Sequence, residues 1–387
     1  MLFRSRGKRK ELKKQIALVL ALATLSTAAL SGCTGGAPSG TAETPGGESS
    51  SGNTGTAGVV NVYNWGEYID MSVLEDFEAE TGIKVNYQTF ESNEALYGKL
   101  AGGAGGYDVI IPSDYMIGQL IEEDMLEPLN FDNIPNFADI DPALKNPEYD
   151  PENLYSVPYM WGLLGVIYNK TMVDEADLGS WDLMWNEKYA DDILMFDNSR
   201  DAIGIGLKML GYSYNTTDEA QIKEAVDLLI EQKPLVQAYV MDEVFGKMEG
   251  GNAAIAMYYA GDYLTMLDNN PDLKFVVPKE GSNWFVDAMC VLKTAQHKEE
   301  AEAWINFIAS TESNLANMDY IGYASPNLEA LEGYPAYYEE TYGEPLDEER
   351  YEIMAAPDDV LARCELYTNL PADTLTLYND LWTELGI

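Results

Sequence analysis

Strand-like and helix-like stretches alternate along most of the chain. Residues 59–63 form a short apolar run, and Asp70 opens an amphipathic stretch that ends at Gly82. Residues 83–88 and 107–111 are again strand-like, with a helical pattern between them. Repeated strand–helix units predict an α/β protein in which helices cover both faces of a largely parallel sheet.

Two strand-like stretches are candidates for connecting separate parts of the molecule. Residues 155–169 read YSVPYMWGLLGVIYN, which is longer than a usual strand, and the second candidate covers residues 285–292. A chain of 387 residues is also long enough for two domains. We therefore predict two lobes joined by two crossover strands. Lobe 1 comprises residues 59–165 and 288–338, and lobe 2 comprises residues 166–287 and 339–387.

The N-terminal region has the pattern of an export signal. Residues 1–15 are rich in Lys and Arg, and residues 16–30 are apolar but too few for a comfortable membrane span. The run ends in Leu-Ser-Gly-Cys33, which resembles a bacterial lipobox, so we expect removal of residues 1–32 and lipid on the Cys33 thiol. An ordinary secretory signal with a chance cysteine is the alternative. Residues 33–58, rich in Gly, Ser and Thr, predict a flexible tether.

The composition excludes several classes of function. The formal net charge is -42, and such a surface repels nucleic acids and anionic lipid head groups. The chain has three cysteines and one histidine, His297, which excludes a zinc site built from Cys and His and an ordinary Cys/His catalytic pair. Cys290 lies in an apolar run, which favours free thiols at Cys290 and Cys364; a disulfide between them is the alternative.

The loop after the first strand carries side chains that suit an organic cation. Residues 61–68 read NVYNWGEY, with two aromatic rings, Trp65 and Tyr68, and one carboxylate, Glu67. No Lys or Arg occurs in residues 61–83. Aromatic faces attract a cation and a carboxylate neutralises it. The alternative is a surface turn with incidental aromatic residues.

Similar side chains follow other predicted strands in both halves of the chain. The candidates are Trp65, Glu67, Tyr68, Ser113, Tyr115, Asp201, Tyr259, Phe285, Asp287 and Tyr323. Arg200 is the one basic residue beside them, so clustered carboxylates would repel one another unless a cation binds between them. Two other classes stay open: a glycoside hydrolase that uses paired carboxylates, and a metal receptor that uses Tyr258 and Tyr259.

From Val59 to the C-terminus the sequence resembles the spermidine/putrescine-binding component of bacterial polyamine ABC importers. The resemblance rests on the stretches YNWGEYID, ETGIKVNYQTFESNE, YDVIIPSDY, YSVPYMWG, LGYSYNTTD, VVPKEG and IGYASPNL. It implies the two-lobed periplasmic binding protein type II fold, with a polyamine held in the cleft and delivered to permease subunits. It also implies a monomer on the outer face of the cell membrane, without enzymatic activity, cofactor or metal.

The resemblance also assigns roles to particular residues. The aromatic box of the family falls on Trp65, Tyr68, Tyr259, Phe285 and Tyr323, its acidic positions on Glu67, Asn198, Asp201 and Asp287, and its cleft loop on Ser113 and Tyr115. A polar contact near the C-terminus falls on Glu365. We expect Asp287 to be the principal ammonium partner.

Asn198 departs from this pattern, because the family often has Asp there. An amide brings no charge, so we expect weaker discrimination in favour of spermidine than in a homologue with Asp. Arg200 would increase that deficit if it faced the cleft, and would have no effect if it pointed to solvent.

Overall fold

The computed structural model describes residues 58–103 and 105–386. The predicted signal peptide, Cys33 and almost all of the predicted tether lie outside the described residues. Residues 58–387 are assigned to one compact unit. The predicted division of this unit into two lobes remains a prediction.

Strands and helices alternate in the first part of this unit, as the sequence predicts. They are β1 (Val59–Trp65), α2 (Met71–Thr81), β2 (Lys84–Phe90), α3 (Asn93–Ala101), β3 (Val109–Ile110) and α4 (Asp114–Glu122). β1 pairs in parallel with β2 on one side and β3 on the other. The Asp70 side chain caps α2 by accepting a hydrogen bond from the Ser72 N–H, and Gly82 ends the helix with φ 73°.

The remaining elements continue this α/β pattern. The strands are β4 (Leu126–Glu127), β5 (Ser156–Asn169), β6 (Ile193–Phe196), β7 (Val236–Val240), β8 (Ile255–Tyr259), β9 (Leu273–Val276) and β10 (Trp284–Leu292). The helices are α5 (Ser199–Met209), α6 (Glu219–Gln232), α7 (Glu243–Glu249), α8 (Ala260–Leu267), α9 (Lys298–Ile308), α10 (Thr311–Ile321), α11 (Leu328–Tyr342), α12 (Glu348–Met354), α13 (Asp358–Leu361) and α14 (Ala372–Leu385). Short 3-10 helices occupy much of the segments 131–144 and 175–189.

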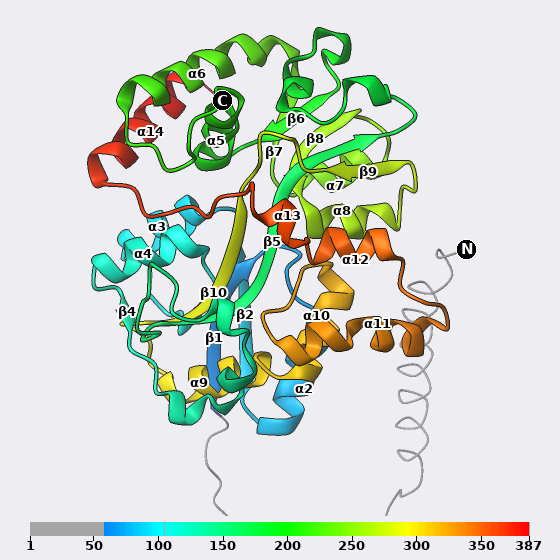
Figure 1. The fold of residues 1–387 in the computed structure, drawn as a ribbon. Helices are drawn as coiled ribbons and strands as arrows, with labels where there is room; N and C mark the ends of the chain where they lie inside the picture. The colour runs from blue at the N-terminus through cyan, green and yellow to red at the C-terminus, as the bar shows by residue number, and fades with distance from the viewer. Residues whose placement is uncertain (1–57, 104, 387) are drawn as a thin grey trace, which may run out of the picture. The chain divides into compact units, whose positions relative to one another are not determined.

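Two long strands connect the N-terminal strands with the middle of the chain. The described strands follow the order β2-β1-β3-β10-β5-β8-β6-β7, with β4 also paired to β10 and β9 to β5. β5 pairs with β10 as far as Leu163 and with β8 from Leu164 onward. Figure 1 shows β5 and β10 side by side between the two groups of strands. The long β-like stretch of the sequence is therefore one continuous strand that changes partner in its middle.

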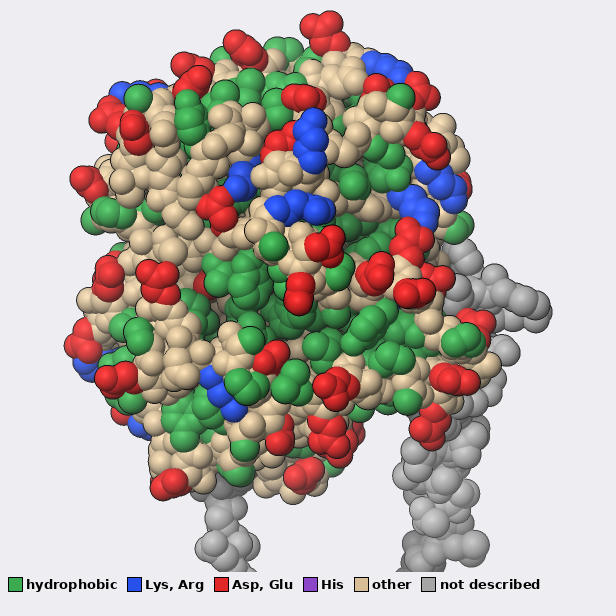
Figure 2. Space-filling view, in the orientation of Figure 1, with side chains coloured by type: hydrophobic (Ala, Val, Ile, Leu, Met, Phe, Trp, Pro, Cys, Tyr) green, Lys and Arg blue, Asp and Glu red, His purple; other side chains and the backbone are tan. Residues whose placement is uncertain are grey.

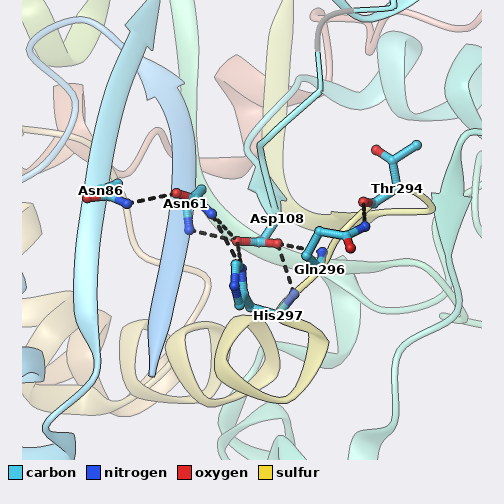
Figure 3. Close-up of polar contacts among 6 residues, drawn as sticks. All are labelled: Asn61, Asn86, Asp108, Thr294, Gln296 and His297. Atoms are coloured by element: carbon cyan, nitrogen blue, oxygen red, sulfur yellow. Dashed lines mark hydrogen bonds and ion pairs between the residues drawn. The ribbon is translucent and has the colours of Figure 1, made fainter. Parts of the chain in front are cut away.

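A buried carboxylate ties the start of β1 to the segment that precedes α9 (Figure 3). Asp108 is 1 % exposed and accepts hydrogen bonds from the Asn61 N–H at 2.9 Å, the Asn61 amide at 2.7 Å and the Gln296 N–H at 2.9 Å. The His297 Nδ1 lies 3.0 Å from the same carboxylate. Burial by itself would raise the pKa of Asp108, but the hydrogen bonds from His297 and Asn61 outweigh it and lower that pKa.

Acidic side chains are spread over the face shown in Figure 2, where Lys and Arg are fewer. This agrees with the strongly negative net charge of the sequence. Cys290 is buried, Cys364 is half-buried, and both thiols are free, as favoured above. Among the described helices, none combines the length and the apolar character that a membrane span requires.

Candidate functional site

A cavity of about 70 Å³ lies where loops from distant parts of the chain meet. The strands β1, β2, β6, β7 and β8 end at its wall, and β10 passes along it. The lining residues that the sequence predicted are Trp65, Tyr68, Ser113, Tyr115, Asn198, Asp201, Tyr259, Phe285, Asp287 and Tyr323. The fold thus brings most of the candidates together, because strand ends from both halves of the chain converge here.

The aromatic wall is held by contacts among its own rings. The Trp65 indole N–H donates to the Ile111 carbonyl at 2.8 Å. Tyr68 meets Tyr323 edge to face with ring centroids 4.9 Å apart, and Phe285 meets Tyr259 at 5.3 Å. Such pairs favour a fixed geometry, so the rings form a rigid apolar surface before any ligand arrives.

Asp287 is the most deeply placed carboxylate of the cavity. It lies at a β-bulge of β10 and is 3 % exposed. The Tyr68 hydroxyl donates to its Oδ2 at 2.8 Å, whereas its Oδ1 has no hydrogen-bond partner among the described residues. Burial raises the pKa of Asp287 to about 7, and the neighbouring Ser113 and Tyr68 side chains offset part of that rise. Burying a carboxylate oxygen without a hydrogen-bond partner costs free energy, so a cationic donor that binds here would be strongly stabilised.

A second carboxylate, Asp262, lines the cavity although the sequence did not identify it as a ligand-binding residue. Asp262 stands in the first turn of α8, three residues after Tyr259. Burial raises the pKa of Asp262 to about 8, and a hydrogen bond with Tyr323 offsets part of that rise. The sequence did contain an indication of this role, because residues three positions apart at the start of a helix lie on the same side of it.

Asp201 differs from Asp287 because neighbouring groups of the protein already bind it. The Asn198 amide donates to its Oδ2 at 3.0 Å, and the Tyr259 hydroxyl donates to the same oxygen at 2.8 Å. The Tyr367 hydroxyl donates to its Oδ1 at 3.0 Å. Burial raises the pKa of Asp201, and these three hydrogen bonds act against that rise. Asn198 also caps α5 by accepting a hydrogen bond from the Asp201 N–H at 2.8 Å.

Further acidic residues of the wall were missed by the sequence analysis. Glu94, in the first turn of α3, accepts a hydrogen bond from the Tyr115 hydroxyl at 2.9 Å. Asp242 lies against Gly66, so closely that a Cβ atom on that glycine would stand 2.4 Å from the Asp242 Oδ2. No local pattern marks these carboxylates, because they reach the cavity only through the packing of separate elements. None of the residues that line the cavity is Lys or Arg.

The structure does not bring Glu67 and Glu365 into the cavity wall. Glu67 is exposed and has a left-handed backbone conformation, with φ 47°. Glu365 forms an ion pair with Lys208 and accepts a hydrogen bond from the Ser213 hydroxyl at 2.5 Å. Arg200 faces neither the cavity nor solvent, because it is 3 % exposed and is packed among tyrosine rings.

A family model confirms what kind of protein has this cavity. Residues 72–342 match the family described as bacterial extracellular solute-binding protein. The chain belongs to this family. It is therefore a solute-binding protein and not an enzyme.

Named relatives agree with the family assignment. The solute-binding protein is 35% identical over 269 residues to the spermidine/putrescine-binding periplasmic protein of Salmonella typhimurium, an alignment that covers 69% of this chain and 77% of the relative. It is 29% identical over 290 residues to a putrescine-binding periplasmic protein of Escherichia coli, covering 70% of this chain and 78% of the relative.

Solved structures show the same fold. A putative spermidine/putrescine ABC transporter from Listeria monocytogenes superimposes with a TM-score of 0.79 at 39% sequence identity, covering 85% of this chain and 99% of that one. A spermidine/putrescine substrate-binding protein from Streptococcus pneumoniae gives 0.70 at 40% identity, covering 85% and 98%. The predicted periplasmic binding protein type II fold is confirmed.

The cavity of this solute-binding protein combines apolar rings with carboxylates that lack basic partners in its wall. Aromatic rings pack against methylene groups and attract cations to their faces, and the carboxylates select positive charge. Tyr258 and Tyr259 both line the cavity, but the described residues contain no cluster of three or more His, Cys, Asp or Glu side chains arranged for a metal ion. The arrangement suits a slender organic cation.

Proposed function

We propose that this solute-binding protein captures a linear polyamine, putrescine or spermidine, outside the cytoplasm and delivers it to the permease subunits of an ABC importer. The observation that carries the proposal is the buried Asp287 carboxylate, with one oxygen unpartnered among the described residues, in an aromatic cavity whose wall also contains the Asp262 carboxylate and has no Lys or Arg. The names of the relatives support the same ligand class.

The size and chemistry of the cavity support a short polyamine. A cavity of about 70 Å³ has room for more than one water-sized group, and a four-carbon diamine joins two ammonium groups through four methylene groups. Burying those methylene groups against rings gains about 3 kcal/mol. An ammonium–carboxylate pair at 4 Å gains about 4 kcal/mol at an effective dielectric constant of 20, before desolvation. The rings and two such pairs together gain roughly 11 kcal/mol before desolvation and the costs of association, and micromolar binding requires about 8 kcal/mol.

Calorimetry with matched ligands tests the proposal. We expect heat of binding with putrescine and spermidine, and none with glucose or ferric citrate. Butane-1,4-diol is the matched control for putrescine, because it keeps the chain length and loses both charges. Binding of the diol as tightly as putrescine, or binding of the sugar instead of the amines, would refute the proposal.

We also propose that β5 and β10 act as hinge strands between two lobes that close on the ligand. The proposal is supported by the change of partner within β5 at Leu163 and Leu164. Small-angle scattering with and without saturating putrescine tests it. A smaller radius of gyration is expected with ligand, and superimposable curves would count against closure.

Lipid anchoring at Cys33 is the remaining part of the proposal, and it is supported by the lipobox sequence that ends at this cysteine. In cells, Cys33→Ala should release the protein from the membrane fraction. Retention of a processed Cys33→Ala protein on membranes would place the anchor elsewhere.

A further inference from the structure

Arg200 is a buried cation directly behind one end of the cavity. It stands in the first turn of α5 and is 3 % exposed. Its guanidinium lies 4.6 Å from the ring centroid of Tyr367 and 5.4 Å from that of Tyr115. Its Nη2 donates to the Asn215 side chain at 3.0 Å and the Thr368 carbonyl at 3.1 Å. In the part of the chain that the structure describes, its Nε and Nη1 have no hydrogen-bond partner, and no salt bridge involves it.

The two rings beside Arg200 connect it to the carboxylates of the cavity. The Tyr367 hydroxyl donates to Asp201, and the Tyr115 hydroxyl donates to Glu94. Each carboxylate is therefore separated from the guanidinium by one phenol ring. A cation over a ring polarises it, and the hydroxyl becomes a stronger donor to the carboxylate beyond.

The charge of Arg200 also acts directly on this end of the cavity. Burial raises the pKa of both Asp201 and Glu94, and the positive charge of Arg200 acts against that rise in each case. For Asp287 and Asp262 at the cavity wall, Arg200 has no comparable influence on the pKa. Asp201 and Glu94 thus have an internal counter-ion, whereas Asp287 and Asp262 have none that acts comparably.

We propose that Arg200 is a specificity-determining residue, a resident counter-ion that makes the cavity prefer a diamine to a triamine. The inference rests on the proposed polyamine-binding function. Asp262 and Asp287 are left to bind the ammonium groups of the ligand. A third ammonium group directed toward Asp201 and Glu94 would meet carboxylates that Arg200 already offsets, and would be repelled by its charge.

The ratio of the two affinities, measured on the whole protein, tests this inference. A merely structural role for Arg200 would weaken the binding of both ligands to the same extent. The measured quantity is the dissociation constant for putrescine divided by that for spermidine, from calorimetry at one pH and one salt concentration. Arg200→Met should raise this ratio about tenfold in favour of spermidine. Arg200→Lys keeps the charge and should leave the ratio within about threefold of the wild-type value.

Two further variants separate charge from packing. Tyr378→Leu removes a third ring that lies 5.6 Å from the Arg200 guanidinium but does not line the cavity, so it should reduce thermal stability without changing the ratio. Tyr367→Phe keeps the ring and removes the donor to Asp201, so it should shift the ratio toward spermidine by about threefold. This variant serves as the test if Arg200→Met does not fold.

An unchanged ratio in Arg200→Met, or an equal shift in Arg200→Met and Arg200→Lys, would overturn the inference. If Arg200→Met is insoluble, an unchanged ratio in Tyr367→Phe would overturn it in the same way. Failure of the wild-type protein to bind either amine would instead refute the proposed function.

Discussion

Asp201, at the end of the cavity near Arg200, receives hydrogen bonds from Asn198, Tyr259 and Tyr367, whereas Asp287 keeps one oxygen without a partner among the described residues. Both carboxylates are buried, so burial alone does not distinguish them. The difference lies in the neighbours, since only the Asp201 end has a buried guanidinium behind its rings. A ligand ammonium group gains most binding free energy at a carboxylate that does not already accept hydrogen bonds from the protein.

The most direct way to break this comparison is to neutralise the carboxylate that has an unpartnered oxygen, Asp287. Asp287→Asn should weaken putrescine binding about 100-fold or more, because removing one partner of a buried ion pair costs about 3–5 kcal/mol. Calorimetry measures the loss. Glu365→Gln is the matched control, since that carboxylate lies outside the cavity wall and should leave the affinity unchanged. Unchanged affinity in Asp287→Asn would remove Asp287 from its proposed role.

The pH dependence should come from Asp287 together with Asp262. The pKa values of Asp287 and Asp262, about 7 and about 8, lie above the ordinary value of 3.8. The unliganded folded protein therefore binds more protons than the unfolded chain, and these two groups should make it lose stability as pH rises from about 4 to about 8. Thermal unfolding without ligand at pH 5 and pH 8 measures this effect.

Ligand binding should follow the opposite course, because ammonium groups need ionised carboxylates. Putrescine should bind about tenfold or more weakly at pH 6 than at pH 8, because at pH 6 binding must release protons from Asp287 and Asp262. Asp262→Asn should flatten this profile as well as weaken binding. A profile that stays equally steep in this variant would show that another group titrates.

Neutralising the partnered carboxylate, Asp201, should have a smaller effect. Asp201→Asn should weaken putrescine binding by less than about tenfold, because hydrogen bonds within the protein already satisfy this carboxylate. Calorimetry beside Asp287→Asn gives the comparison. If both variants lose affinity equally, the two carboxylates do not differ in the way proposed.

The smallest expected effect concerns Asn198. Asn198→Asp adds a charge beside Asp201 and should raise spermidine affinity relative to putrescine affinity by about threefold. Asp is as good a helix cap as Asn, so α5 should still start at the same place. Asn198→Ser keeps a capping side chain without charge and serves as the control. An equal gain for the two amines, or a gain for putrescine alone, would exclude Asn198 from the choice of ligand.

Local patterns in the sequence determined the elements and much of the wall. The alternation of strand and helix, the caps at Asp70 and Gly82, and the long strand β5 were predicted because each depends on neighbouring residues. The aromatic positions Trp65, Tyr68, Tyr259, Phe285 and Tyr323 follow the same logic, since they occur at or near the ends of elements and were further supported by the family resemblance.

Only the tertiary structure decided which charges share the cavity. Tyr367 donates to Asp201 across 166 positions of sequence, and no local pattern predicts such a pair. Glu365 has a carboxylate like those of the cavity wall, but Lys208, 157 positions away, forms an ion pair with it. Arg200 directly precedes Asp201 in the sequence but lies behind the rings. The sequence determines which charges are available, and long-range packing determines which of them are left for a ligand, because desolvation and pairing depend on neighbours in space.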